Sequence, residues 1–466
     1  MGDISSNELN KKKKMSTDEQ NCFTEEPVKE NVEIIIKDAW LSNVQKRVEE
    51  TKLVNWSTQS PTIFKVPRIL KETNPSAYEP RIISLGPYHR SDTELQATDN
   101  LKWQYLKYFL RRFCNINLDY YLNLIKNMED DLRRAYSEDL SMIPSNDFIL
   151  MMLLDGCSVI LKILWAYGSA TTLWADVKIS RDIFMLENQL PFFLLEALFN
   201  SAFPHQPDSL SQNILDYINK ITGSDLELPS SDSGRFHHIL HLYHSCIIVP
   251  IDDPTPTQSS TSGLRRKLNK LLRFRKKQRK TQRELTWIPS ATLLKQAGIH
   301  FKRKKNAKSF LNITFKDGEI EIPQLQMDDH TNTVLRNLIA YEQCSVEAPT
   351  YVTSYVHFMD CLIDTAEDVE LLQQDDIIIS GLGDSDEVAT VFNELFKEVV
   401  IESEEDYLAD ICEKISKHRN TSYNKWRAKL NHDYFNSPWA LISLVGAIFL
   451  FILTAIQTIY TVLGYY

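Results

Sequence analysis

The C-terminal end of the chain restricts its fold more than any other feature. Residues Asn436–Tyr466 contain no charged side chain, and Trp439–Leu463 covers 25 residues. As a helix, this segment is long enough to cross a hydrocarbon core of about 30 Å with some tilt. We therefore predict one C-terminal transmembrane helix; the alternative is a buried core helix. The predicted span includes Trp439, Ala440, Gly446, Phe449, Thr454, Tyr460 and Leu463.

The flanks of this segment predict its orientation. Three residues follow Leu463, which is typical of a tail anchor, and three basic residues precede the span: Lys425, Arg427 and Lys429. Positive residues favour the cytosolic side, so we expect a membrane protein, at the plasma membrane, with its large domain in the cytosol. Glycosylation sequons at Asn55, Asn312 and Asn420 leave the opposite orientation open.

The composition excludes several classes of protein. Of 466 residues, 43% are hydrophobic and 24% are charged, which is typical of a globular chain and not of a disordered or collagen-like one. The slightly negative mean hydropathy excludes many membrane spans. A net charge of -10 argues against nucleic acid as a partner. Seven cysteines, an odd number without a CxxC pair, indicate reduced thiols.

The charge is unevenly distributed along the chain. Leu264–Arg283 holds eleven Lys and Arg residues and no acid, so the other 41 basic residues face 62 acids, a balance of -21. With its leucine stripe, this segment predicts a helix that contacts anionic lipid, although a calmodulin-type target, a nuclear-import patch or a solvated insertion fits as well. The expected lipid contacts are Arg265, Arg266, Lys267, Lys270, Arg273, Arg275, Lys276 and Lys277. Gly2 lies in a loose myristoylation pattern and is a candidate for lipidation.

The remaining patterns predict a mainly α fold with a small β component (α+β). We expect a polar arm over residues 1–60, a globular region over 61–435 interrupted by a linker and basic insertion at 252–284, and the transmembrane helix at 439–463. Short β-prone runs lie near residues 64–67 and 78–89, and Asp317-Gly318 predicts the turn of a hairpin. Expected helices include Phe148–Trp165, Asp182–Asn200, Arg336–Glu342, Tyr355–Leu372 and Glu387–Phe396.

Candidate chemistry is sparse. His237, His241 and His244 would share one helix face, but no carboxylate or cysteine stands at metal-ligand spacing, so a polar helix face is the preferred interpretation. Asp384-Ser385-Asp386 lacks the glycine of a calcium loop, since Ala389 stands in its place. GxSxG, Walker A and GxGxxG motifs are absent. We therefore predict no catalytic, metal or cofactor site, and the alternative is an enzyme that uses Glu187, Asp155 or His241 in a cleft.

A series of ordered motifs is more specific than any single one. It comprises Ile63-Phe64-Lys65-Val66-Pro67, Ala77-Tyr78-Glu79-Pro80, Ile83-Ser84-Leu85-Gly86-Pro87-Tyr88-His89, Lys102-Trp103-Gln104-Tyr105-Leu106, Met152-Leu153-Leu154-Asp155-Gly156-Cys157, Leu186-Glu187-Asn188-Gln189-Leu190-Pro191-Phe192-Phe193, Asn337-Leu338-Ile339-Ala340-Tyr341-Glu342-Gln343, Phe392-Asn393-Glu394-Leu395 and Ser437-Pro438-Trp439-Ala440. From about Ile63 to the C-terminus, the chain resembles the plant-specific domain-of-unknown-function 247 family.

This resemblance implies a single-span membrane protein with a large globular region, without an established enzyme activity. Some grass members of the family act as recognition proteins in pollen–stigma self-incompatibility, which implies an unknown protein or peptide partner. The family has no agreed catalytic residues to carry over. From the residues themselves, Glu187-Asn188-Gln189 before Pro191 forms a polar corner in an apolar segment, so we interpret it as architectural.

Overall fold

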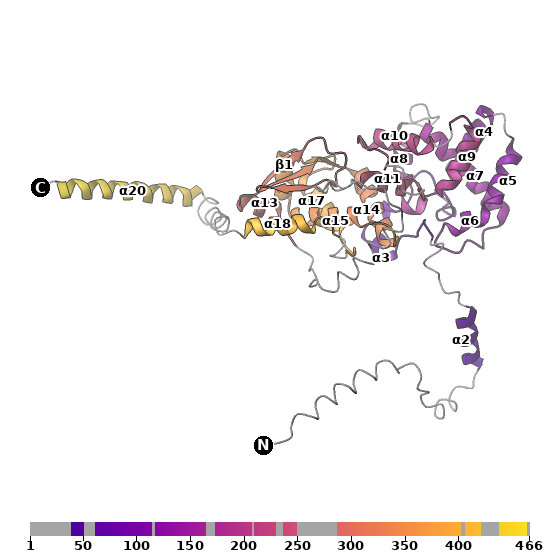
Figure 1. Cartoon of the computed structure of the whole chain (residues 1–466), viewed down its shortest axis with the longest axis horizontal. Helices are drawn as coiled ribbons and strands as arrows, with labels where there is room; N and C mark the ends of the chain where they lie inside the picture. The colour runs from indigo at the N-terminus through magenta and orange to yellow at the C-terminus, as the bar shows by residue number, and fades with distance from the viewer. Residues whose placement is uncertain are drawn as a thin grey trace, which may run out of the picture. The chain divides into compact units, whose positions relative to one another are not determined.

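Helices form most of the described chain, and the strands are few and short (Figure 1). The computed structural model describes residues 39–50, 61–113, 117–164, 173–206, 209–229, 236–248, 287–401, 406–420 and 438–463. Contacts divide the chain into Met1–Ser60 and Pro61–Tyr466. The first unit contributes one amphipathic helix, α2, and the second contains the hydrophobic core. The predicted α+β class with mainly helical content is confirmed.

The element bounds are as follows. The helices of the first half are α2 (Ala39–Glu50), α3 (Arg68–Thr73), α4 (Asp99–Arg112), α5 (Leu118–Asn127), α6 (Glu129–Arg134), α7 (Ser145–Leu164), α8 (Leu173–Asp182), α9 (Phe192–Ala202), α10 (Leu210–Thr222) and α11 (Ile239–Ile247). The later helices are α13 (Ala291–Gln296), α14 (Asp329–Cys344), α15 (Tyr351–Leu362), α16 (Ala366–Gln374), α17 (Ser385–Leu395), α18 (Ala409–Arg419) and α20 (Pro438–Leu463). Short 3-10 turns are η1 (Pro75–Ala77), η2 (Leu95–Thr98) and η3 (Leu186–Asn188).

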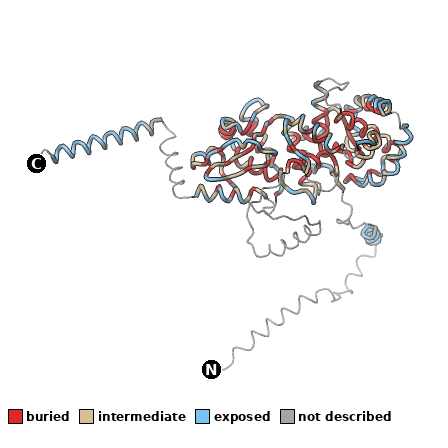
Figure 2. Tube along the Cα trace, turned by 45° about the horizontal axis from the view of Figure 1, so that its top comes forward, coloured by how far each residue is buried: buried red, intermediate tan, exposed pale blue. Residues whose placement is uncertain are grey.

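Helix α7 is the central helix of the first half of the core. Its side chains are buried on nearly every face, as its almost continuous apolar sequence predicts. It packs against α4, α5, α9 and α10. Gly156 makes one of these contacts close, because a Cβ there would lie 2.5 Å from the side chain of Leu198 on α9. Figure 2 shows the same distribution, with buried residues gathered inside the globular part and exposed ones along α20.

The predicted continuous helix over Asp182–Asn200 is wrong. Helix α8 ends at Asp182, the chain makes the turn η3, and α9 begins only at Phe192, directly after Pro191. Proline lacks the amide hydrogen that a helix interior needs and suits the position just before a helix or in its first turn. The predicted helix Tyr355–Leu372 is also divided, because Thr365 and Asp368 form a capping box that starts α16.

The predicted hairpin is confirmed, and one strand beside it was not expected. Strands β2 (Thr314–Lys316) and β3 (Glu319–Pro323) pair antiparallel around Asp317 and Gly318, which have φ of 50° and 84°. Two positive φ angles in a row suit a two-residue hairpin turn. Strand β1 (His300–Lys304) pairs parallel with β3, which gives the order β1-β3-β2, and β4 (Leu325–Met327) pairs parallel with β5 (Ile378–Ser380).

The β-prone segment before α4 is extended but forms no strand of a sheet. Ile63 makes one isolated bridge to Tyr136, and residues 82–85 have no partner strand. Buried backbone amides still need hydrogen-bond acceptors. Here side chains supply them, so the tertiary contacts replace the sheet that the pattern suggested.

The predicted C-terminal transmembrane helix is overturned. In the part of the chain that the structure describes, no helix is long and apolar enough to cross a membrane. A crossing helix needs about 20 consecutive apolar residues. Helix α20 (Pro438–Leu463) also carries polar residues in its second half, namely Thr454, Gln457, Thr458 and Thr461. The membrane location inferred from this helix is corrected with it.

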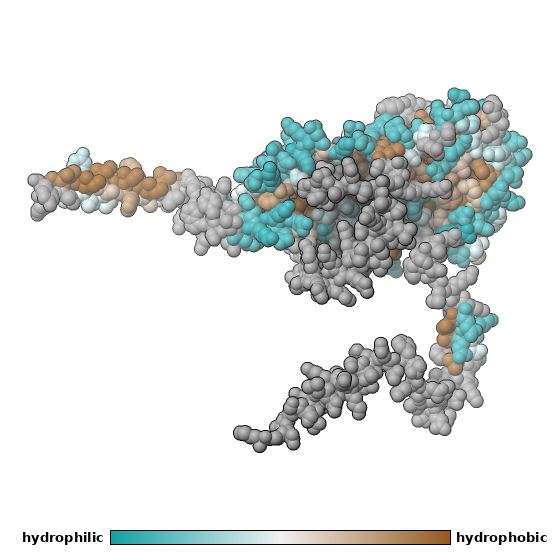
Figure 3. All heavy atoms as spheres, viewed as in Figure 1, coloured by the Kyte–Doolittle hydropathy of each residue, from teal (hydrophilic) through white to brown (hydrophobic). Residues whose placement is uncertain are grey.

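Helix α20 itself is regular and largely apolar. Figure 3 shows apolar residues along its surface, and described side chains such as Gly446, Phe449, Tyr460 and Leu463 are exposed. The side chains of Trp439 and Ala440 lie outside the described residues. Thr454 donates a hydrogen bond to the carbonyl of Leu450, which satisfies its hydroxyl within the helix.

A pair of glycine substitutions tests how closely the extended segment packs. Gly86 has φ of 68°, and a Cβ there would lie 2.9 Å from Tyr136 Oη and 3.1 Å from the carbonyl of Gln189. Gly86→Ala should lower the free energy of unfolding by about 3 kcal/mol, measured by denaturant titration. Gly223 is the matched control, with φ of 65° but no atom within 4 Å of its Cβ position. Gly223→Ala should cost only about 1 kcal/mol, and equal losses would contradict the close approach at Gly86.

Candidate functional site

Glu187 anchors the extended segment at the start of the globular unit. Its Oε1 accepts from the amide of Val66 at 2.8 Å, and its Oε2 lies 2.9 Å from Lys71 Nζ and 3.2 Å from His89 Nε2. Burial by itself raises the pKa of Glu187, but the bonds from His89, Lys71 and Val66 outweigh it, so the pKa lies below its ordinary value. Glu187 is therefore a charged structural group whose acceptor sites are occupied.

Two further buried acids hold the same segment. Asp182 accepts the amides of Arg81, Ile82 and Ile83 within 3.1 Å. Asp155, on α7, accepts the amide of Gly86 at 2.9 Å and forms an ion pair with Lys102 at 2.7 Å. Burial raises the pKa of both carboxyls, against the hydrogen bonds that favour the charged forms. These contacts join the segment to α7 and α8.

The side-chain amides complete this arrangement. Asn188 accepts the amide of Leu85 at 2.6 Å and donates to the carbonyls of Ile83 and Asp182. Gln189 donates to two carbonyls of the α8–η3 connection and accepts the amide of Leu240 at the start of α11. The interpretation of Glu187-Asn188-Gln189 as an architectural corner is confirmed by these bonds.

The histidines also make internal hydrogen bonds, and they do not form the predicted polar helix face, because His237 lies outside the helix and His244 is buried. Helix α11 begins at Ile239, so His237 precedes it, and His238 is its buried N-cap, accepting from the amide of His241. His241 Nδ1 accepts the amide of His237 at 3.0 Å. His244 is buried, with Nε2 2.7 Å from Glu342 Oε1. Burial lowers the pKa of His241 to about 3, so its ring is neutral.

The geometry of the described residues does not support a metal site. Among the described residues, no group of three or more His, Cys, Asp or Glu side chains is arranged to hold a metal ion. Asp384, considered for a calcium loop, is the N-cap of α17 and accepts the amide of Glu387. These side chains make the bonds that helix starts require.

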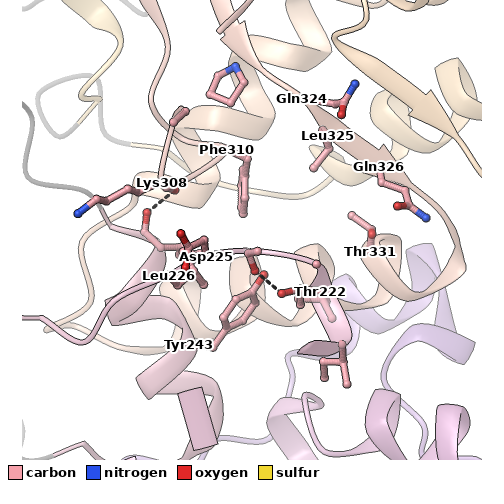
Figure 4. Close-up of a pocket in the computed structure, with 18 of the residues that line it drawn as sticks. Thr222, Asp225, Leu226, Tyr243, Lys308, Phe310, Gln324, Leu325, Gln326 and Thr331 are labelled. Atoms are coloured by element: carbon pink, nitrogen blue, oxygen red, sulfur yellow. Dashed lines mark hydrogen bonds between the residues drawn. The ribbon is translucent and has the colours of Figure 1, made fainter. Parts of the chain in front are cut away.

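A large open pocket lies elsewhere, between the end of α10, strand β1 and strand β4. Its volume is about 890 Å³. Figure 4 shows Thr222, Asp225 and Tyr243 on one side and Gln324, Leu325 and Gln326 across from them, with Phe310 between the two groups. Glu187, Asp155 and His241 do not line this pocket.

The lining of the pocket is basic. Five cationic residues belong to it, against two acids, Asp225 and Asp328; the cations are Lys220, Arg303, Lys304, Lys305 and Lys308. Lys308 pairs with Glu227 at 2.7 Å, and Lys304 donates to Asn312 at 2.8 Å. Arg303 and Lys305 have no ion-pair partner within the described parts of the chain. An excess of fixed positive charge around a concave surface attracts anionic groups.

Apolar and neutral groups form the rest of the lining. Leu325, Leu335 and Ile247 are buried residues whose side chains border the pocket. Burial raises the pKa of Tyr243 and lowers that of His330, so the phenol stays protonated and the imidazole neutral near pH 7. The described lining therefore combines apolar area with cations.

Sequence reasoning missed this pocket. The signal was the run Phe301–Lys308, which contains five basic residues. It is shorter and less basic than Leu264–Arg283, the segment that we interpreted as a lipid contact. That longer segment, with its candidate lipid contacts, and Gly2 lie outside the described residues. Only folding places Arg303–Lys308 opposite the end of α10.

Comparison with known proteins gives a family without an assigned activity. The sequence model of DUF247, described as a plant protein of unknown function, matches residues 63–453. The chain is 28% identical to the UPF0481 protein At3g47200 of Arabidopsis thaliana, over 87% of each chain. It is 23% identical to the putative UPF0481 protein At3g02645 of the same plant, over 90% of this chain and 93% of that one. No solved structure matches significantly.

Replacing Glu187 tests the charged anchor. In Glu187→Gln, the amide group faces Lys71 and His89 without a compensating charge, so the free energy of unfolding should fall by about 2 kcal/mol or more. The contribution of a carboxyl with a lowered pKa is complete above its ordinary value of 4.5 and is lost as the pH falls through the folded value. The difference in the free energy of unfolding between wild type and variant, measured by denaturant titration, should therefore become smaller below about pH 4.5.

The control for this experiment is Glu72→Gln. Glu72 pairs with Arg68 on α3 at 2.8 Å, and both side chains are exposed. That change should cost well under about 1 kcal/mol at any pH. If the loss of unfolding free energy in Glu187→Gln stays constant down to acid pH, Glu187 is not a charged anchor.

Proposed function

This chain belongs to the DUF247 family of plant proteins of unknown function, and we propose that it is a recognition protein whose basic pocket binds an acidic segment of a partner protein without catalysing a reaction. The observation that carries the proposal is the lining of the pocket, with five cations and two acids around a volume of about 890 Å³. A cleft of this size suits a ligand that fills it with side chains.

The origin of the lining favours a peptide segment over a compact anion. The cations come from α10, from the end of β1 and from the residues that follow it, and apolar residues such as Phe310 and Leu325 belong to the same lining. A small anion such as phosphate would contact the cations but would leave the apolar side chains of the lining without a contact. A peptide segment with acidic and apolar side chains uses both.

The enzyme alternative has weaker support. Its candidate residues, Glu187, Asp155 and His241, each make internal hydrogen bonds that hold a fold element in place. None of them borders the pocket. A nucleophile needs a neighbouring base and open space for a substrate, so we favour binding over catalysis.

Binding of a labelled glutamate-rich peptide tests this function. Fluorescence anisotropy with the full chain should show saturable binding that weakens as salt rises, because screening reduces the attraction between charges. The double variant Arg303→Glu and Lys305→Glu should weaken binding about tenfold or more. Inorganic phosphate at matched ionic strength should compete no better than chloride.

The control is Lys316→Glu, an exposed lysine on β2 outside the pocket. It changes the charge by as much as either substitution of the double variant alone, and it should leave the affinity within about twofold of wild type. Equal weakening by the control, equal binding of a lysine-rich peptide, or specific displacement by phosphate would overturn the proposal.

A further inference from the structure

Strand β4 has one occupied edge and one open edge. It pairs with β5 in parallel, and alternate residues of β4 bond to the β5 side: the amide of Leu325 donates to the carbonyl of Ile377 at 2.8 Å, and the carbonyl of Met327 accepts from the amide of Gly381 at 2.8 Å. In a parallel ladder, the residue between two bonded residues points its N–H and C=O to the opposite edge. Gln326 is that residue. Among the described residues, its main chain has no hydrogen-bond partner on that edge.

Strand β1 does not extend along β4. It pairs with β3 and ends at Lys304, opposite Pro323, whereas β4 forms a separate sheet with β5. Within the described chain, no strand therefore pairs with the second edge of β4.

This open edge borders the basic pocket. Gln324, Leu325 and Gln326 line the pocket together with Arg303 and the residues that follow it to Phe310. Figure 4 shows this stretch of β4 facing Phe310 and the turn after α10. The position beside β4 thus combines unpaired main-chain groups with cationic side chains.

We propose that an extended acidic segment of the partner protein adds as a strand to the open edge of β4. The inference rests on the proposed function and specifies its mode. The main chain of Gln326 bonds to the segment, as in other cases where a peptide extends an exposed sheet edge. Unpaired edges are templates for such pairing.

The faces of β4 specify the pattern of the bound segment. Leu325 and Met327 are buried, and Gln326 is exposed. Side chains of neighbouring strands share a face with the residues opposite them. Apolar side chains of the segment therefore lie on the side of Leu325, and acidic ones lie on the side of Gln326. The matching ligand is a strand that alternates apolar and acidic residues.

Backbone methylation of the peptide tests this mode without altering the protein. The probe is a labelled octapeptide of alternating Glu and Val, bound to the full wild-type chain. In an added strand, the N–H groups of only one residue type face β4. Methylating the amides of that type should weaken binding about tenfold or more, while methylating the other type should leave the affinity largely unchanged.

A pair of protein variants provides the second measurement. Gln326→Pro removes the N–H that faces the open edge and leaves the bonds of Leu325 and Met327 to β5, so it should lower the affinity strongly. Gln326→Ala keeps the N–H and should bind nearly as wild type does. Circular dichroism and thermal unfolding check that both variants fold; if Gln326→Pro does not, the methylated peptides decide.

The outcomes separate the mode from the function. If both methylated peptides bind equally well, or are weakened equally, strand addition is wrong, even if Arg303→Glu and Lys305→Glu still abolish binding. If Arg303→Glu and Lys305→Glu do not change the affinity, the proposed function is wrong, and the strand-addition mode that rests on it is wrong too. Methylation that weakens binding for one residue type only, together with loss in Gln326→Pro, supports both.

Discussion

The fold depends on the hydrogen bonds that buried carboxylate and amide side chains accept from the main chain of one extended segment. Val66 and residues 83–86 are buried in the core, and they lie outside the sheets of the described chain. Asp182, Glu187 and Asn188 accept main-chain amides of this segment, and all three lie where α8 gives way to α9. Leaving a buried amide unpaired costs roughly 1–3 kcal/mol, so several such bonds are comparable with the whole stability of a domain.

The same bonds determine the positions of several helices. Asp155 connects the segment to α7, and Asn337 of α14 accepts the amide of Leu186 and donates to the carbonyl of Ala77. Gln189 reaches the start of α11. One polar corner therefore joins elements from the first and last parts of the globular chain. This explains why ionisable residues that resemble catalytic candidates in the sequence are structural in the molecule.

In the pocket, by contrast, charged side chains and main-chain groups remain available to bind a ligand. Arg303 and Lys305 lie at the end of β1, and Gln326 lies on β4, which pairs with β5 alone among the described strands. The open edge of β4 arises because β1 ends opposite Pro323, before β4 begins.

The sequence by itself determined what depends on local pattern. Continuous apolar character predicts the buried helix α7, and Asp317-Gly318 predicts the hairpin, because periodicity and turn geometry act over a few residues. It did not determine the break between α8 and α9, the pairing of β1 with β3, or the placement of Arg303 and Gln326 around one pocket. Tertiary structure decided these features, because each depends on contacts between residues far apart in the chain.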